Sequence, residues 1–190
     1  MHALVRTLSG AAAFAVLVSM TTAVQPTDKE STISLGEGKL TLTAPEKWVR
    51  KEPRTRIVEH EFAVEGKKGQ DAGRVTVMAA GGSIEDNINR WISQFKKPDD
   101  KTKLRQHVEK RKVAGLEVEI VDLAGTYRDM PGGPRAGGKA IDRENYRMLG
   151  AIIPGGPSIG NYFIKFYGPA ELVKENEKAF STMIESLEKK

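Results

Sequence analysis

The stretch that decides the fold runs from Gly73 to Phe95 and reads GRVTVMAAGGSIEDNINRWISQF. From Arg74 to Ala80 the side chains alternate with a period of two, which indicates a β-strand. Two glycines then break the pattern, and Ser83 is a preferred helix N-cap residue, with Asp86 completing a shortened capping box. The residues that follow predict an amphipathic helix, whose apolar stripe is Ile84, Ile88, Trp91, Ile92 and Phe95.

The chain before this stretch predicts more strands. Residues 33–43 alternate on either side of a Gly-Glu-Gly turn, which indicates a hairpin. Residues 57–64 predict a strand that places His60 on an apolar face. Glu59 and Glu61 lie on the opposite face, so we expect half of this strand to face water.

The chain after the stretch predicts a run of longer strands. Residues 104–127 indicate a solvent-exposed strand, a turn and a return strand, and residues 146–153 and 161–167 indicate two more. The return strand and the two that follow it are apolar on both faces. Gly168-Pro169 then begins a last helix, since proline suits the first turn. Its apolar stripe is Leu172, Val173, Ala179, Phe180, Met183, Ile184 and Leu187.

These patterns predict the architecture. Strands that are apolar on both faces must be covered on both faces. The two amphipathic helices are far apart in the sequence and can supply one cover each. Because hairpin-length connections join the strands, the sheet should be mostly antiparallel. We therefore predict an α+β fold, a three-layer α/β/α sandwich with a mostly antiparallel central sheet.

The N-terminus has the order of regions found in a secretory signal peptide. Arg6 precedes an 11-residue apolar run from Leu8 to Val18, and small residues follow, with Ala23 the expected last residue removed. An uncleaved anchor is the alternative, but the run is well short of the ~20 residues that span a bilayer. We predict export to the periplasm or secretion, with a signal peptide at 1–23, a flexible lead-in at 24–32 and a single domain at 33–190.

Composition limits both chemistry and partners. The chain has no cysteine, which excludes thiol nucleophiles, disulfides and thiolate zinc sites. A formal net charge of +5 favours weak attachment to acidic surfaces. Nucleic acid is not an expected partner, because no basic helix or aromatic platform appears. We expect no cofactor, no integral membrane segment after signal cleavage, and an unidentified protein or anionic ligand as partner.

Four motifs together point to a known family. They are Pro45-x-x-Trp48, the Gly81–Phe95 segment, the Tyr162–Lys165 strand ahead of Gly168-Pro169, and the helix end Met183–Leu187. With them, most of residues 31–188 resembles the PsbP-like family of α/β/α sandwiches, and its exported bacterial members without assigned activity above all. The resemblance implies a non-catalytic binding or assembly role. The photosystem-binding and GTPase-binding residues of the better-known relatives match no position of this chain.

Candidate catalytic residues are few. His2 lies in the signal segment, and the remaining His60 and His107 have no metal-ligand spacing. On its apolar strand face, His60 fits a buried, hydrogen-bonded histidine better than a catalytic one. Ser83 does not fit the Gly-x-Ser-x-Gly nucleophile pattern, because Glu85 takes the last position. We therefore expect no catalytic and no metal-binding residue.

Two surfaces are candidates for partner binding. Residues 128–145 are rich in glycine and proline and predict a long loop, a kind of segment that often carries function. Arginines there suit a carboxylate or a phosphate. The basic residues are Arg128, Arg135, Lys139, Arg143 and Arg147. On the first helix, Asn87, Arg90 and Gln94 line one side. A solvated loop and a solvated helix flank are the alternatives.

The leading functional hypothesis is an exported, non-catalytic binding or accessory protein. One alternative is a hydrolase that uses His60 with a carboxylate, and another is a purely structural envelope protein. Strand alternation argues against the hydrolase, since Glu59 and Glu61 point away from His60. A deep cleft beside His60 would favour the enzyme, and a filled environment would favour the binding protein.

Overall fold

The computed structural model describes residues 31–96, 104–130 and 139–190. Within these ranges the main sheet is antiparallel and has the order β3-β4-β5-β9-β8-β7-β6. Its strands are β3 (Trp48–Lys51), β4 (His60–Val64), β5 (Gly73–Ala80), β6 (Arg105–Val113), β7 (Leu116–Asp129), β8 (Ile141–Pro154) and β9 (Asn161–Pro169). A small sheet of order β1-β2-β10 joins β1 (Thr32–Leu35), β2 (Leu40–Thr43) and β10 (Glu188–Lys189).

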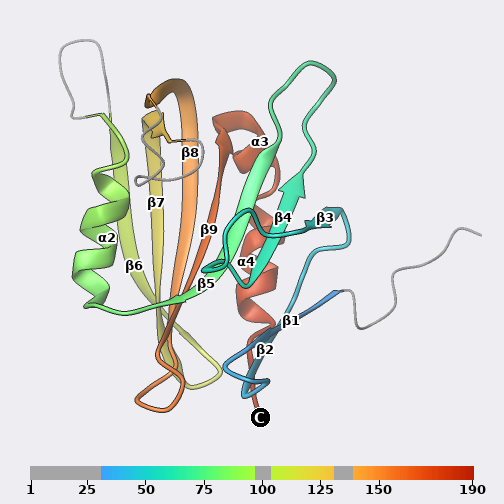
Figure 1. Ribbon diagram of the computed structural model, residues 1–190, viewed down its shortest axis with the longest axis vertical. Helices are drawn as coiled ribbons and strands as arrows, with labels where there is room; N and C mark the ends of the chain where they lie inside the picture. Colours follow the sequence, from blue (N-terminus) through green and yellow to red (C-terminus); the bar gives the residue numbers. More distant parts are fainter. Residues whose placement is uncertain (1–30, 97–103, 131–138) are drawn as a thin grey trace, which may run out of the picture.

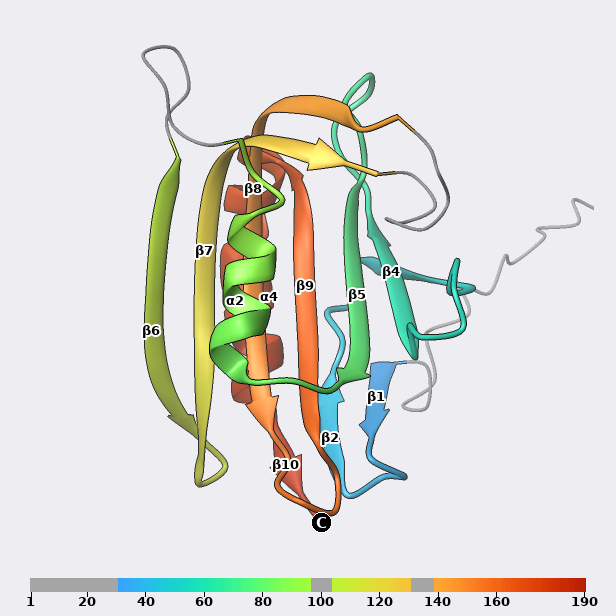
Figure 2. The same ribbon diagram turned by 60° about the vertical axis from the view of Figure 1, so that its left-hand side comes forward.

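Helices lie on both faces of the main sheet, as Figures 1 and 2 show. Helix α2 (Ile84–Ile92) covers one face, and helices α3 (Ala170–Glu175) and α4 (Glu177–Glu185) cover the other. The three-layer sandwich predicted from the sequence is confirmed. The last helix is divided at Asn176, whose side-chain amide donates to the Leu172 carbonyl (2.9 Å). None of the described helices is long and apolar enough to cross a membrane.

Two apolar cores fill the spaces between the layers. On the α2 side the core includes Trp91, Met148 and Ile152, and on the α4 side it includes Leu149 and Ile153. Adjacent residues of β8 thus serve opposite cores, which is the arrangement that the two-sided apolar pattern predicts. The β1-β2 hairpin adds Ile33, Leu35, Leu40 and Leu42 to the α4-side core.

Local interactions fix the position of α2. The Ser83 hydroxyl accepts a hydrogen bond from the Asp86 amide (3.0 Å), so the predicted cap is confirmed. Trp91 packs edge-on against Phe163, with ring centroids 6.0 Å apart. It also lies directly over Gly150, where a Cβ atom would come within 2.4 Å of the indole ring. Gly150 therefore allows the helix to approach the sheet closely.

Two strand predictions need correction. Strand β4 begins at His60 rather than Ile57, and Ile57 is exposed. Glu61 was expected to face water but is only 3% exposed.

The loop predicted at 128–145 is shorter, because β7 continues to Asp129 and β8 begins at Ile141. Residues 131–138 lie outside the described residues.

A β-bulge changes the direction of side chains near the end of β8. Gly125 pairs with Tyr146 and Tyr127 pairs with Arg143, so two residues of β8 oppose Thr126 alone. Asn145 has a positive φ of 54°, a conformation that asparagine tolerates better than most residues. The bulge brings Arg143 to the same side of the sheet as Tyr127.

The helices cover the two faces unevenly. Figure 2 shows α2 in front of β7 and β8, with β5 and β4 to one side of it. On the opposite face, α3 and α4 pack mainly against β8 and β9. On the α2 side, β4 and β5 therefore have no described helix over them.

Candidate binding sites on the two faces

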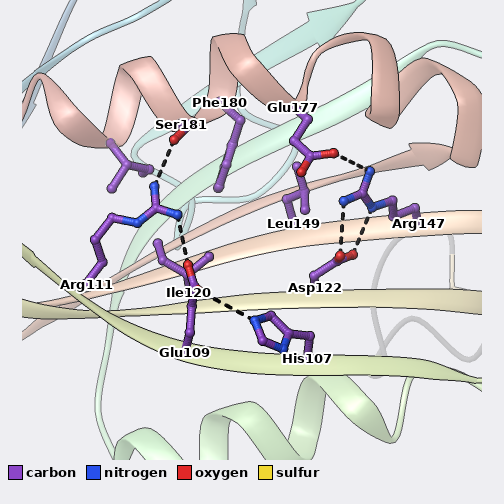
Figure 3. Close-up of a pocket in the computed structure, with 11 residues that line it drawn as sticks. His107, Glu109, Arg111, Ile120, Asp122, Arg147, Leu149, Glu177, Phe180 and Ser181 are labelled. Carbon is purple, nitrogen blue, oxygen red and sulfur yellow. Dashed lines mark hydrogen bonds and ion pairs between the residues drawn. The ribbon is translucent and has the colours of Figure 1, made fainter.

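The α4 side has a pocket of about 260 Å³ between α4 and strands β6, β7 and β8 (Figure 3). Its apolar lining is Ile120, Leu149, Phe180 and Ile184, and its polar lining is His107, Glu109, Arg111, Asp122, Arg147, Glu177 and Ser181. The pocket thus combines an apolar wall with several charged groups.

Arg147 holds the charged wall of this pocket together. Its Nε and Nη2 donate to the two oxygens of Asp122 at 2.8 and 3.0 Å, and its Nη1 donates to Glu177 at 2.7 Å. Arg105 also contacts Asp122. Burial alone would raise the pKa of Asp122, but Arg147 and Arg105 outweigh it and hold that pKa below its ordinary value. Asp122 and Arg147 are therefore both charged.

The remaining polar groups of the pocket bind one another. Arg111 donates to Glu109 (2.8 Å) and to Ser181 (2.8 Å), and His107 lies 3.3 Å from Glu109. These contacts, that of Arg111 foremost, lower the pKa of Glu109. The Ser181 hydroxyl donates to Glu185 rather than to a base. The arrangement offers binding surfaces and no activated nucleophile.

Lys165, on β9, is the centre of a second polar cluster, on the α2 side. Its Nζ is 2.9 Å from the Tyr127 hydroxyl and contacts Gln94 Oε1. It also lies 4.8 and 4.6 Å from the ring centroids of Tyr127 and Tyr167, as in cation–π pairs. The residue keeps some accessible surface, but protein atoms crowd its ammonium group. This burial, and then the charge of Arg74, lower the pKa of Lys165 to about 7.

Arg74 links this cluster to the buried Glu61. Its Nε and Nη2 each donate to a Glu61 oxygen at 2.8 Å, and its Nη1 donates to the Tyr167 hydroxyl at 3.2 Å. The Arg54 amide also donates to Glu61 (3.1 Å). The hydrogen bond from Arg74 is the main reason that the pKa of Glu61 is lowered, although burial opposes it. These partners explain why Glu61 is buried and not solvated.

The outer ends of β7 and β8 form an arm that crosses above β9 and β5, in yellow and orange in Figure 2. Asp71, in the loop between β4 and β5, holds this arm. It accepts a hydrogen bond from the Tyr146 hydroxyl (3.1 Å) and pairs with Arg143 (3.3 Å). Arg143 also lies 3.5 Å from Asp129. The arm therefore bounds the Lys165 cluster at one end.

The basic residues predicted as one recognition loop are not brought together. Arg147, predicted as a partner-binding residue beside the loop, is buried in β8 and faces α4, so it does not lie on a partner-facing surface. Arg143 is a strand residue in ion pairs. Arg128 and Lys139 are exposed, and Arg135 lies outside the described residues.

The helix flank predicted as a partner surface is also divided. Asn87 is buried, and its side-chain amide donates to the carbonyls of Gly81 (3.2 Å) and Ser83 (2.8 Å). Its role is therefore to hold the turn before α2, and its assignment to a partner surface is wrong. Arg90 is exposed, whereas Gln94 binds Lys165.

The surroundings of His60 are those of a structural histidine. Its Nε2 lies 2.9 Å from the Ser34 carbonyl and its Nδ1 lies 3.0 Å from Arg50 Nη1. Glu61 is on the other face with Arg74, and Glu59 accepts from the Tyr162 hydroxyl (3.2 Å). In the described part of the chain, no group of three or more histidines, aspartates and glutamates is placed to hold a metal ion.

Sequence reasoning missed the Lys165 cluster, although a signal was present. Lys165 lies between Ile164 and Phe166 in a strand that is apolar on both faces. A lone charge in such a strand is costly unless it has a specific role. Tyr167 lies two residues further along β9 on the same face, but Tyr127 comes from β7, so only the fold brings it to Lys165.

Comparisons with known proteins agree with the architecture. No family model matches the sequence, and no curated protein matches it either. The structure is similar to the solution structure of cyanobacterial PsbP (CyanoP) from Synechocystis. The TM-score is 0.51 at 11% identity, over 84% of this chain and 91% of that chain. The fold is PsbP-like.

A second solved structure is also similar. It is LpqN, involved in cell envelope biogenesis of Mycobacterium tuberculosis, with a TM-score of 0.49 and 8% identity over 78% of this chain and 82% of that chain. The PsbP-like fold confirms what the Pro45–Trp48, Gly81–Phe95 and Tyr162–Lys165 motifs predicted.

Proposed function

We propose that the chain is an exported, non-catalytic accessory protein whose α4-side pocket binds a small, largely apolar molecule without net charge. The main observation in support is that each carboxylate lining the pocket already has an arginine partner. A general acid or base needs a proton that it can exchange near neutral pH. The pKa values of Asp122 and Glu109 are lowered by their arginine partners, so neither carboxyl holds a proton to donate near neutral pH.

The lining also determines the kind of ligand. Phe180, Ile184 and Leu149 offer apolar contact, and a volume of about 260 Å³ suits a molecule smaller than a typical drug. Two arginines face three carboxylates in the pocket, and Arg105 adds a positive charge to Asp122. The charges are thus nearly balanced and paired with one another, so a charged ligand would lose its hydration without gaining an unpaired charge of opposite sign.

A binding experiment can test the pocket directly. A fragment screen by 15N–1H NMR should find small neutral molecules that shift the amide signals of Phe180 and Ile184. Ser181→Trp places an indole in the pocket and should abolish these shifts. Thr182→Trp adds the same group at the next, exposed position of α4 and should leave them unchanged. Fragments that bind Ser181→Trp as well as the parent protein would refute the assignment.

Export rests on the predicted signal peptide and has its own test. N-terminal sequencing of the protein from its host should begin near Val24. Recovery of intact Met1 in the cytoplasmic fraction would contradict export without affecting the pocket.

A protein-binding surface is the second candidate, favoured by exposed apolar residues at the end of the β7–β8 arm. Met130 is 39% exposed and Ile141 is 44% exposed, and Arg128 and Lys139 lie beside them in the sequence. Replacing residues 130–140 by a short turn should leave the fold intact and remove partners captured from a host extract. Unchanged capture would place protein recognition elsewhere.

A further inference from the structure

We propose that the Lys165 cluster, formed by Arg74, Gln94, Tyr127, Lys165 and Tyr167, is a binding site for a carboxylate group. The cluster lies on the opposite face of the sheet from the α4-side pocket, and it does not depend on the function proposed for that pocket.

The first observation is an excess of hydrogen-bond donors. A lysine ammonium has three N–H groups, and Lys165 directs two of them to Gln94 and Tyr127. Tyr127 and Tyr167 act as acceptors toward Lys165 and Arg74, so their own hydroxyl hydrogens remain to be donated. Burial raises the pKa of Tyr127, which keeps its hydroxyl protonated. The available acceptors, Glu61 and Gln94, are already engaged.

The second observation is the balance of charge. Within the described residues, no carboxylate lies within ion-pair distance of Lys165 Nζ. Arg74 is paired with Glu61, to which the largely exposed Arg54 also binds, so the buried charge left without a carboxylate is that of protonated Lys165. Asp129 is the acidic residue whose charge raises the pKa of Lys165, but Asp129 is itself paired with Arg143. One uncompensated positive charge matches a carboxylate better than a doubly charged phosphate.

The third observation is access. Arg74, Lys165 and Tyr167 all keep part of their surface exposed. Helix α2 lies over β7 and β8 and leaves β5, which carries Arg74, beside it (Figure 2). A carboxylate approaching over β5 would therefore reach the exposed parts of Arg74, Lys165 and Tyr167 first, and the buried Tyr127 hydroxyl lies behind them.

Binding at this site should be coupled to protonation. The groups around Lys165 are Arg74 from β5, Glu61 from β4, Tyr127 and Asp129 from β7, Arg143 and Tyr146 from β8, and uncharged Gln94 after α2. Of these, Lys165 has a pKa brought to about 7. The carboxylate binds the ammonium form, so its affinity should be highest below pH 7 and should fall as the pH rises above it.

Acetate is a suitable probe. Sodium acetate is titrated into labelled full-length mature protein at pH 6, with sodium chloride of equal ionic strength as the reference. Saturable shifts of the Gln94 side-chain amide and of Lys165 Cε are expected with acetate only. Their midpoint should move to about thirtyfold higher concentration at pH 8.5, because only about 3% of Lys165 is then protonated. A response to chloride equal to that to acetate would overturn the proposal.

Variants separate the site from general effects on folding. Lys165→Met should abolish the saturable shift, and Tyr167→Phe, which removes one hydroxyl, should weaken binding about tenfold. Lys110→Met is the matched control, because Lys110 lies on β6 beside Glu117 and Glu119. Binding by Lys165→Met or Tyr167→Phe as strong as that of the parent protein would refute the site.

The carboxylate can belong to a free acid or to a protein partner. The peptide acetyl-Ala-Glu-Ala-amide carries the same group on a backbone. Tighter binding of the peptide than of acetate would support the site as one for protein partners, and equal binding would support it as one for free acids. Failure of both ligands would contradict the proposal and would leave the α4-side pocket untouched.

Discussion

Both faces of the sheet carry a buried arginine–carboxylate pair, but the charges around the two pairs differ. On each face an arginine forms a bidentate pair with a buried carboxylate, Arg147 with Asp122 and Arg74 with Glu61. On the α4 side, Glu177 begins the helix and adds a second carboxylate to Arg147. On the α2 side, the cation on the sheet is Lys165. It contacts Gln94, which follows α2 and is uncharged. In the Arg147 network the buried charges have partners of opposite sign, whereas on the α2 side Lys165 has no anionic partner.

The largest expected effect concerns the cover of the α2 side. Trp91→Ala removes the indole that packs on Gly150 and Phe163 and should reduce the free energy of unfolding by about 3–5 kcal/mol. Urea denaturation measures the change, with Asn89→Ala on the exposed side of α2 as the control. A parent-like midpoint for Trp91→Ala would show that α2 does not cover this face.

The two arginines should differ in the cost of their removal. Arg147→Met leaves Asp122 buried with Arg105 alone, and we expect a loss of about 3 kcal/mol or more. Arg74→Met should cost less, because Glu61 keeps Arg54 and its backbone amide. Denaturation of both variants tests the order. A greater loss for Arg74→Met would reverse the comparison.

The sequence predicted the parts of this fold that depend on periodicity. The two-sided apolar pattern of residues 146–153 placed Met148 and Leu149 in opposite cores, and the Ser83 cap marked the start of α2. Each of these features is set by neighbouring residues along one element, which a period of two or 3.6 reveals.

The sequence could not predict where the buried charges lie. Glu61 alternates like a solvent-facing residue, and only the pairing of β4 with β5 brings Arg74 beside it. Arg147 falls in the strand predicted at 146–153, but the sequence does not show that Asp122 and Glu177 bind it on the α4 side. The Lys165 cluster joins residues of β5, β7 and β9 with Gln94, which follows α2, so its chemistry appears only after folding.

The pH dependence of stability should show the contrast between the faces. The lowered pKa of Asp122 means that its contribution is present above its unfolded pKa of ~4 and is lost in acid. The pKa of Lys165, lowered to about 7, means that the unfolded chain binds more protons between pH 7 and ~10. Stability should therefore rise over that alkaline range. Melting temperatures of Lys165→Met should lack this rise, and a rise equal to that of the parent protein would assign it to another group.

A smaller effect is expected from giving the α2 side the carboxylate that it lacks. Gln94→Glu should form an ion pair with Lys165, raise the stability at pH 7 by about 1 kcal/mol or less, and prevent acetate binding. Gln106→Glu, at an exposed position of β6, is the control. Undiminished acetate binding by Gln94→Glu would show that the anion does not need the Lys165 charge.

The measurement that tests the contrast most directly is the titration of Lys165 itself, followed by NMR at its Cε. With burial and Arg74 acting on an amine that has no anionic partner, the midpoint should lie near pH 7. In Gln94→Glu it should move upward, toward the ordinary lysine value. A midpoint close to ~10.4 in the parent protein would contradict the account, because Lys165 would then titrate like a lysine in water.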